Sequence, residues 1–149
     1  MLREQLAKFN SIMQGIEKFY ADYAKSVGLT YMSLTVLEII YYAPNPITQK
    51  EICEESHYIK QMVNNIVKNF YESGYVEFKE VESDRRNKYV LFTASGRKYA
   101  DEIMKPLMER EEKAITVLSN EERNKMINMI SKSFRYIKFL FNAMNEGIF

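Results

Sequence analysis

The segment 47–93 constrains the fold of this chain more than any other part of it. Thr48 and Glu51 have the spacing of a capping box, in which each side chain satisfies a free backbone N–H of the other residue, so we expect a helix to begin there. This helix should be short and end near Ser56, because a turn follows at residues 57–58. An amphipathic second helix is expected directly after the turn.

The second helix and the residues after it complete the pattern. We expect this helix to run to Ser73, since Gly74 is well suited to the left-handed conformation that ends a helix. Apolar and polar residues then alternate on both sides of a polar loop, residues 83–87, and such alternation predicts a β-hairpin. Two helices joined by a turn and followed by a hairpin form a helix-turn-helix with a β-wing. That arrangement places one helix in a DNA groove and a basic loop beside it.

A long apolar stripe precedes this segment. It advances in alternating steps of four and three residues, which is the seam of a coiled coil and predicts one long helix. Because a lone domain of this size could hardly cover such a seam, either a second helix of the chain or a partner subunit must bury it. The stripe consists of Leu2, Leu6, Phe9, Met13, Ile16, Tyr20, Tyr23 and Val27.

Caps and breaks mark the other helices. Thr30 can cap a helix that runs to about Ala43, and prolines at 44 and 46 then break the chain because they fix φ and remove backbone donors.

Two further helices follow the hairpin. Thr93 can cap a helix over residues 94–118, which Pro106 is expected to kink. Ser119 and Glu122 form another capping box, and the helix that they start carries a second apolar stripe. Its members are Met126, Ile130, Phe134 or Ile137, Phe141 and Met144.

These patterns predict a mainly α fold with a small two-stranded β-wing, in a single domain of residues 1–149. We expect a winged helix-turn-helix lobe over residues 28–93, flanked by a helical dimerisation region that comprises residues 1–27 and 94–149. The apolar stripes at the two ends of the chain should pack together and against a second copy.

The charge balance limits the kind of nucleic-acid contact that is possible. The chain has 21 Lys and Arg against 20 Asp and Glu, and residues 47–93 hold seven basic and eight acidic side chains, which counts against DNA binding. The acidic residues, however, fall mainly before the second helix and along the strands. The candidate contact surfaces hold Lys60, Lys68, Arg85, Arg86 and Lys88.

The second helix carries the residues that would read DNA. Four polar residues share one face at helical spacing, whereas an apolar set occupies the other side, where it can pack on the domain. Asn and Gln can form paired hydrogen bonds with adenine in the major groove, and a lysine at either end can meet a phosphate. The alternative is a solvated face that happens to be rich in amides. The polar set is Gln61, Asn64, Asn65 and Lys68, with Lys60 beside it, and the apolar set is Ile59, Val63, Ile66, Val67 and Phe70.

The hairpin loop strengthens the DNA interpretation. Arg85 and Arg86 lie at its tip, where a purely structural protein gains little from two cations. An arginine there can enter a minor groove, which is narrow and strongly negative in A·T-rich tracts. Asp84 can pair with an arginine or close the turn. The alternative is an ordinary solvated loop.

These residues resemble the MarR family of winged-helix regulators. The resemblance lies in three runs and extends to the flanking helices. The most specific element is an Asp-x-Arg wing that is followed seven residues later by Thr. The runs are Ile47-Thr48-Gln49-Lys50-Glu51-Ile52, Gly74-Tyr75-Val76 and Asp84-Arg85-Arg86 through Leu91-Phe92-Thr93.

The resemblance implies an obligate homodimer with interlocked terminal helices that binds a pseudo-palindromic operator, usually as a repressor. By motif position, Arg86 would be the minor-groove arginine and Asp84 its supporting carboxylate. This chain departs from many members, which carry an arginine where it has Asn65 and Ser or Thr where it has Gln61 and Asn64. We therefore expect its operator to offer more adenine and less guanine at the major-groove positions.

Other candidate sites have a structural interpretation. We interpret Cys53 as a packing residue and His57, the only histidine, as a turn residue, and we expect no metal site, no cofactor and no catalysis. The single cysteine fits a reducing cytoplasm. The longest apolar tract, residues 34–43, contains Glu38 and is too short for a bilayer, so we expect a soluble protein.

Tyrosines cluster around the first two helices. Their residues are Tyr20, Tyr23, Tyr31 and Tyr41, with Tyr42 beside them. They can serve core and dimer packing, or they can line a pocket for a small aromatic or apolar effector. We expect a homodimeric DNA-binding transcriptional regulator, a repressor that such an effector releases. The alternative is a winged-helix protein-interaction module without DNA binding.

Overall fold

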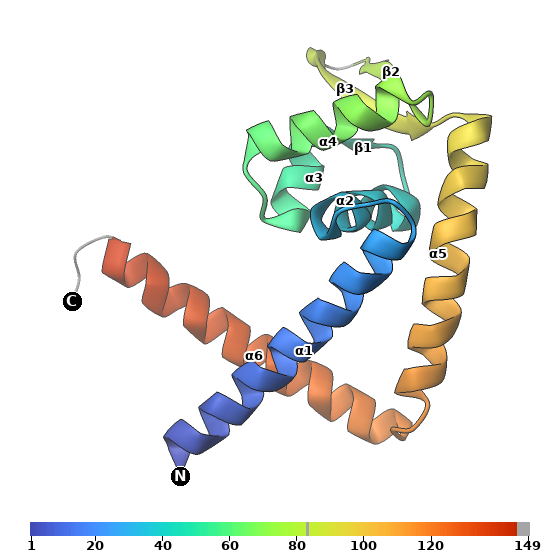
Figure 1. Cartoon of the computed structure of the whole chain (residues 1–149). Helices are drawn as coiled ribbons and strands as arrows, with labels where there is room; N and C mark the ends of the chain where they lie inside the picture. The colour runs from blue at the N-terminus through green and yellow to red at the C-terminus, as the bar shows by residue number, and fades with distance from the viewer. Residues whose placement is uncertain (83, 146–149) are drawn as a thin grey trace. The chain divides into compact units, whose positions relative to one another are not determined.

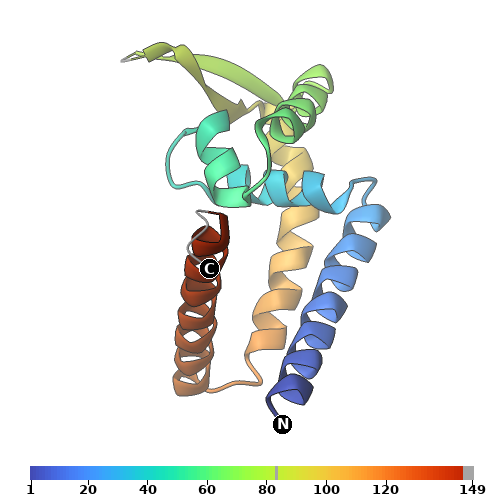
Figure 2. The ribbon, with the colours of Figure 1, turned by 90° about the vertical axis from the view of Figure 1, so that its left-hand side faces the viewer.

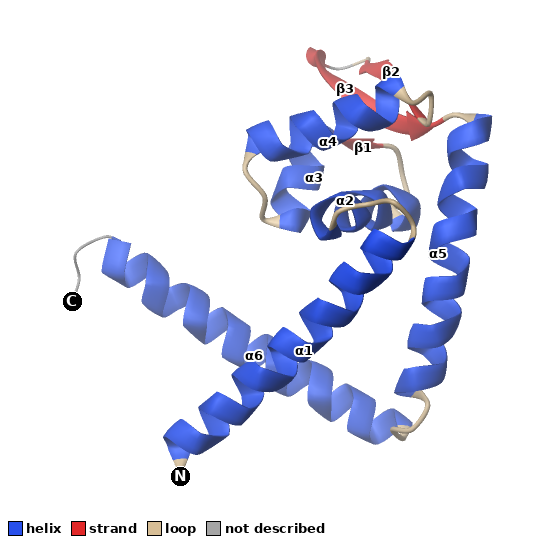
Figure 3. Ribbon diagram, viewed as in Figure 1, coloured by secondary structure: helices blue, strands red, loops and turns tan. Residues whose placement is uncertain are grey.

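The computed structural model describes residues 1–82 and 84–145, without the side chains of residues 84–86 and 145. Helices dominate the described residues, and a small antiparallel sheet accompanies them (Figures 1 and 3). The chain divides into two compact units, Met1–Lys105 and Pro106–Phe149. The elements are α1 (Leu2–Ser26), α2 (Tyr31–Tyr42), β1 (Ile47–Thr48), α3 (Gln49–Ser56), α4 (Lys60–Glu72), β2 (Val76–Val81), β3 (Asp84–Phe92), α5 (Ala94–Ile115) and α6 (Asn120–Asn145).

The core of the first unit forms around α2, which packs against α1, α3 and α4. Leu34, Val36 and Leu37 of α2 are fully buried, as are Ile52 of α3 and Val63 of α4. Their burial removes apolar surface from water and fixes the angle between α3 and α4. The predicted helix-turn-helix is therefore held on a third helix, α2.

The sheet has three strands in the order β1-β3-β2, all antiparallel. Its β2–β3 hairpin forms an arm that extends away from the helices of the first unit (Figure 2). The sequence predicted two strands, and β1 adds a third because Ile47, which is buried, pairs with Val90. The hairpin strands are also longer than predicted, since Asp84 of β3 already pairs with Val81 of β2. The expectation that residues 84–87 form a loop was therefore wrong, because cross-strand pairing extends β3 through them.

The predicted caps are present. The Thr30 hydroxyl accepts a hydrogen bond from the backbone N–H of Ser33 at the start of α2, and the Thr93 hydroxyl accepts one from Gly96 at 3.0 Å at the start of α5. Ser119 and Glu122 form the capping box of α6, with bonds of 2.7 and 3.2 Å. The helix α5 ends at Ile115, three residues before the predicted end.

Two glycines have backbone roles. Gly74 follows α4 with φ of +73°, the left-handed conformation expected for the residue that ends a helix. Gly96 lies in the first turn of α5, and a Cβ built on it would lie 1.7 Å from the carbonyl oxygen of Tyr75. No larger residue fits there without backbone movement, so Gly96 allows α5 to start directly against the beginning of the hairpin.

The predicted apolar stripe of α1 is exposed up to Ile16, whereas Tyr20, Tyr23 and Val27 are half-buried. Leu6, Phe9, Met13 and Ile16 retain between 44% and 56% of their side-chain exposure. In α6, considered by itself, the predicted stripe is similarly exposed from Ile130 onward, whereas Met126 is half-buried. Such continuous apolar surface is typical of an interaction surface. None of the described helices combines the length and the apolar character needed to cross a membrane.

Candidate nucleic-acid interface

The helix α4 presents a polar ridge to solvent. This ridge, which we call the α4 ridge, lies on the side of the helix opposite the one that faces the core. The periodicity of four buried residues, Val63, Ile66, Val67 and Phe70, orients the helix in this way. The α4 ridge consists of the exposed residues Lys60, Gln61, Asn64, Asn65 and Lys68.

One member of the predicted apolar side was placed wrongly. Ile59 is 64% exposed and does not pack on the domain. It is the N-cap of α4 and has extended backbone angles, so its side chain does not follow the helical face on which Val63 is buried.

The charge of the α4 ridge is partly compensated. Lys68 lies 3.6 Å from Glu72, one turn further along the helix, and both side chains are largely exposed. Exposed pairs of this kind contribute little and separate readily. Lys68 can therefore exchange its carboxylate partner for another anion.

A cleft lies between α3, α4 and the hairpin, and we call it the helix–wing cleft. Its volume is about 620 Å³. It brings together three residues that the sequence assigned to DNA contact, namely Lys60, Asn64 and Lys88. Its other lining residues are Gln49, Lys50, Cys53, Glu54, Phe78 and Asn87.

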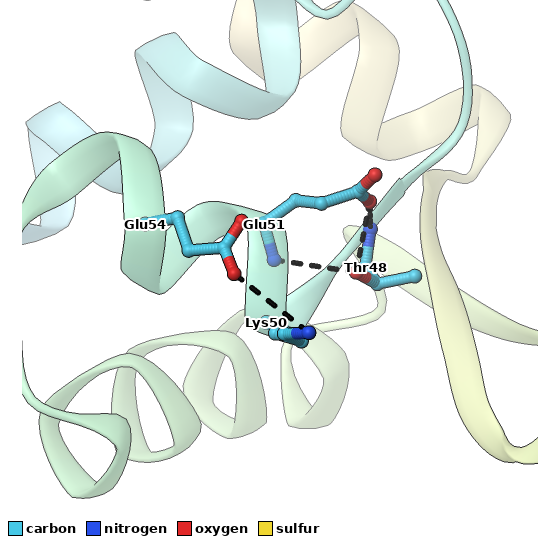
Figure 4. Close-up of polar contacts among 4 residues, drawn as sticks. All are labelled: Thr48, Lys50, Glu51 and Glu54. Atoms are coloured by element: carbon cyan, nitrogen blue, oxygen red, sulfur yellow. Dashed lines mark hydrogen bonds and ion pairs between the residues drawn. The ribbon is translucent and has the colours of Figure 1, made fainter.

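Lys50 is the cation of this cleft that the sequence reasoning missed. It lies on the first turn of α3, and its ammonium group is 3.9 Å from the Glu54 carboxylate (Figure 4). The capping box could have indicated the position of Lys50, because a helix that begins at Gln49 places Lys50 and Cys53 on neighbouring turns of one side. That this side faces α4 and the hairpin depends on tertiary packing.

The capping box itself fixes the start of α3 (Figure 4). The Thr48 hydroxyl accepts a hydrogen bond from the Glu51 N–H at 3.3 Å, and the Glu51 carboxylate accepts one from the Thr48 N–H at 2.7 Å. The Thr48 hydroxyl also donates a hydrogen bond to the Glu51 carboxylate at 2.8 Å. The two bonds that this carboxylate accepts, from the Thr48 backbone N–H first and from its hydroxyl second, lower the pKa of Glu51. The ionised carboxylate thus holds the edge of the cleft in place.

Two further residues of the helix-turn-helix have defined positions. His57 is the C-cap of α3 with φ of +59°, so the prediction of a turn residue is confirmed. Cys53, which we interpreted as a packing residue, is half-buried and lines the helix–wing cleft.

Among the wing cations assigned to DNA contact, Lys88 is the one whose side chain the structure describes. Lys88 is exposed and lies opposite Glu80 in the register of the hairpin strands. The side chains of Asp84, Arg85 and Arg86 lie outside the described part of the chain, so their roles stay predictions.

The predicted effector tyrosines lie at two ends of α2. The rings of Tyr20 and Tyr31 have centroids 6.5 Å apart, and Tyr31 lines a cavity of about 290 Å³ with Met13 and Ile16 of α1. Tyr41 lines a different cavity, next to Arg97, at the other end of α2. The structure therefore separates Tyr31 from Tyr41.

Two tyrosine hydroxyls tie helices to α5. Tyr23 donates to the carbonyl oxygen of Ile103 at 2.6 Å, and Tyr41 donates to Asp101 at 2.9 Å. Burial, followed by the hydrogen bond with Asp101, raises the pKa of Tyr41, while hydrogen bonds from Lys105 and then Tyr41 lower the pKa of Asp101. Both tyrosines therefore have structural partners in this unit.

Within the described residues, no group of three or more His, Cys, Asp or Glu side chains is placed to hold a metal ion.

Residues 27–87 match the family model described as MarR family. This segment, which contains the helix-turn-helix and most of the wing, is similar to the MarR family. Among curated proteins, none matches the chain.

Solved MarR-type structures share the fold over nearly the whole chain. NMB1585, a MarR family regulator from Neisseria meningitidis, is 21% identical with a TM-score of 0.80, over 93% of this chain and 96% of that one. MepR from Staphylococcus aureus in its DNA-binding conformation is 19% identical with a TM-score of 0.78, over 89% and 98%. The MepR–DNA complex is 20% identical with a TM-score of 0.69, over 88% and 96%. The chain thus has the fold of a MarR-family transcription regulator.

Proposed function

We propose that this protein is a homodimeric, sequence-specific DNA-binding transcriptional regulator that represses a pseudo-palindromic operator until a small apolar or aromatic effector releases it. The observation that carries the proposal is the α4 ridge, an exposed row of amides and lysines on a helix whose other side is buried. MepR, which has a similar fold, has been solved in complex with DNA.

The polar residues of the interface divide into two roles. Gln61, Asn64 and Asn65 would read bases, since each good amide–adenine pair gives roughly 1–3 kcal/mol of discrimination. Lysines supply affinity that falls with salt, because each phosphate contact releases counterions. The phosphate contacts would be Lys60, Lys68 and Lys88. The sequence motif adds Arg86 in the minor groove with Asp84 in support, and Arg85 is a second cation beside it.

The exposed stripes support dimerisation. Leu6, Phe9, Met13 and Ile16 of α1 present a coiled-coil seam to solvent, and α6 presents a stripe of its own. A second copy of the chain is the partner that such self-complementary seams fit. The dimer would place two α4 helices in successive major grooves about 34 Å apart.

An effector would act on that spacing. Tyr20 and Tyr31 offer aromatic surface where α1 meets α2, beside the cavity that Met13 lines. A ligand bound there would shift the population toward dimers whose recognition helices do not fit the operator.

A protein-interaction module without DNA binding is the second candidate. It is favoured by the charge of residues 47–93, where eight acidic side chains outnumber seven basic ones. If the protein is such a module, the α4 ridge binds another protein, and duplex DNA does not compete for it.

Selection from a random duplex library with the purified protein, followed by fluorescence anisotropy, tests the proposal. We expect an enriched, inverted-repeat site, and a replacement of Asn64 and Asn65 by alanine should weaken its binding at least tenfold. The control replaces Asn124 and Asn128, two exposed asparagines on α6, and should leave affinity unchanged. Failure to enrich any site at low salt would favour the interaction module.

A further inference from the structure

The proposed binding mode places a constraint on the helix–wing cleft. If α4 enters the major groove and the wing enters the neighbouring minor groove, a sugar–phosphate strand must pass between them, because that strand separates the two grooves. In this chain the space between α4 and the wing is the helix–wing cleft. Its chemistry should therefore suit a polyanion rather than a base edge.

The cations of the cleft meet this requirement. Lys50, Lys60 and Lys88 come from α3, α4 and β3, three different elements, and all three side chains are exposed. Lysine is a point charge on a flexible stem, so it can follow a phosphate without fixed geometry. Convergence of three lysines on one cleft, in a segment whose net charge is slightly negative, concentrates positive charge where the backbone would cross.

Glu54 is an acidic residue in the lining of this otherwise cationic cleft. Its carboxylate lies 3.9 Å from the Lys50 ammonium, and the two side chains are 62% and 74% exposed (Figure 4). So loose and solvated a pair contributes little to stability, and a phosphate can replace the carboxylate at Lys50 at small cost. Once displaced, Glu54 remains beside the cleft and repels the strand.

We propose that the helix–wing cleft holds one sugar–phosphate strand of the operator, that Lys50 anchors this strand, and that Glu54 competes with the strand for Lys50. This inference rests on the proposed function. Since phosphate contacts are alike at every sequence, the competition weakens binding to all duplexes equally. Only sites at which the α4 ridge adds base contacts then hold the protein, so Glu54 limits non-specific binding.

The thiol of Cys53 provides a direct probe of occupancy. It is the only cysteine of the chain, it is half-buried, and it lines the cleft. The rate of alkylation of Cys53 by N-ethylmaleimide can be measured by mass spectrometry. We expect saturating duplex to slow this alkylation at least fivefold. Raising the salt until the complex dissociates should restore the free rate. An equal rate with and without bound duplex would overturn the proposal.

Charge variants test Lys50 and Glu54 separately. Lys50→Gln should weaken binding several-fold and reduce the slope of log affinity against log salt by about 0.9, the value for one phosphate contact. Glu54→Gln should tighten binding several-fold to operator and random duplex alike. The controls are Lys18→Gln and Asp22→Asn, a Lys–acid pair with the same spacing on α1 that lies outside the cleft, and these should change neither quantity.

The outcomes separate this inference from the proposed function. A wild-type protein that binds no duplex overturns both. A wild-type protein that binds duplex, while Lys50→Gln keeps the same salt slope or Glu54→Gln the same affinity, overturns the role of these residues alone. Urea titration of each variant establishes that it is folded before its affinity is compared.

Discussion

Substitution of Gly96 by alanine gives the strongest perturbation of the lobe that the structure predicts. The added Cβ would lie 1.7 Å from the Tyr75 carbonyl oxygen, half of the 3.4 Å at which ordinary contact begins. That oxygen also accepts the Thr93 N–H at 3.1 Å, and the Thr93 hydroxyl donates to Gly74 at 2.6 Å. The clash is with backbone and cannot be relieved by a rotamer change. We therefore expect a loss of about 1–3 kcal/mol or more, the usual cost of overpacking.

Urea unfolding at one fixed protein concentration measures this loss, because the stability of a dimer depends on concentration. Gly15→Ala is the matched control. Gly15 is an exposed residue within α1, and nothing lies within 4 Å of an added Cβ. Its substitution should stabilise the protein by about 0.5–1 kcal/mol through helix propensity. A Gly96→Ala protein as stable as the wild type would refute the proposed contact between α5 and the start of the hairpin.

Four further predictions concern the capping box, the α1 seam and the wing. Thr48→Ala should cost about 1 kcal/mol of unfolding free energy in urea, the typical loss for an N-cap. Because the folded state lowers the pKa of Glu51, its contribution is complete above the ordinary glutamate pKa and is lost as the pH falls through the lower, folded-state value. Glu51→Gln should thus lose less stability on acidification, and an identical pH profile would contradict this. Phe9→Glu should convert the proposed dimer into monomers in sedimentation velocity, whereas an unchanged mass would exclude the α1 seam from the interface. Arg86→Ala should weaken operator binding by roughly 1–3 kcal/mol in anisotropy if it reads a groove, and unchanged affinity would remove that role.

Features that depend on neighbouring residues were predictable from the sequence. The capping box of Thr48 and Glu51 is confirmed because its two hydrogen bonds span only three residues. The orientation of α4 is confirmed for Val63, Ile66, Val67 and Phe70, since periodicity alone decides which side of a helix is buried. Ile59 failed because the periodicity was extended into a residue before the first turn.

Features that depend on distant residues were not predictable. The strand β1 exists because Ile47 meets Val90, and the hairpin is longer than expected because Asp84 meets Val81. The same holds for the site, since Lys50 joins Lys60 and Lys88 only through the packing of α3 against α4 and the hairpin. The tyrosines were grouped by their proximity in sequence, whereas α2 holds Tyr31 and Tyr41 at its opposite ends.

Hydroxyl-radical footprinting of the selected site tests most directly whether the α4 ridges of a dimer grip one duplex. The account predicts two protected tracts related by two-fold symmetry, with centres about one helical turn, roughly 10 base pairs, apart. Both tracts should vanish together in the variant that lacks the Asn64 and Asn65 amides. A single tract, or protection that survives this variant, would contradict the account.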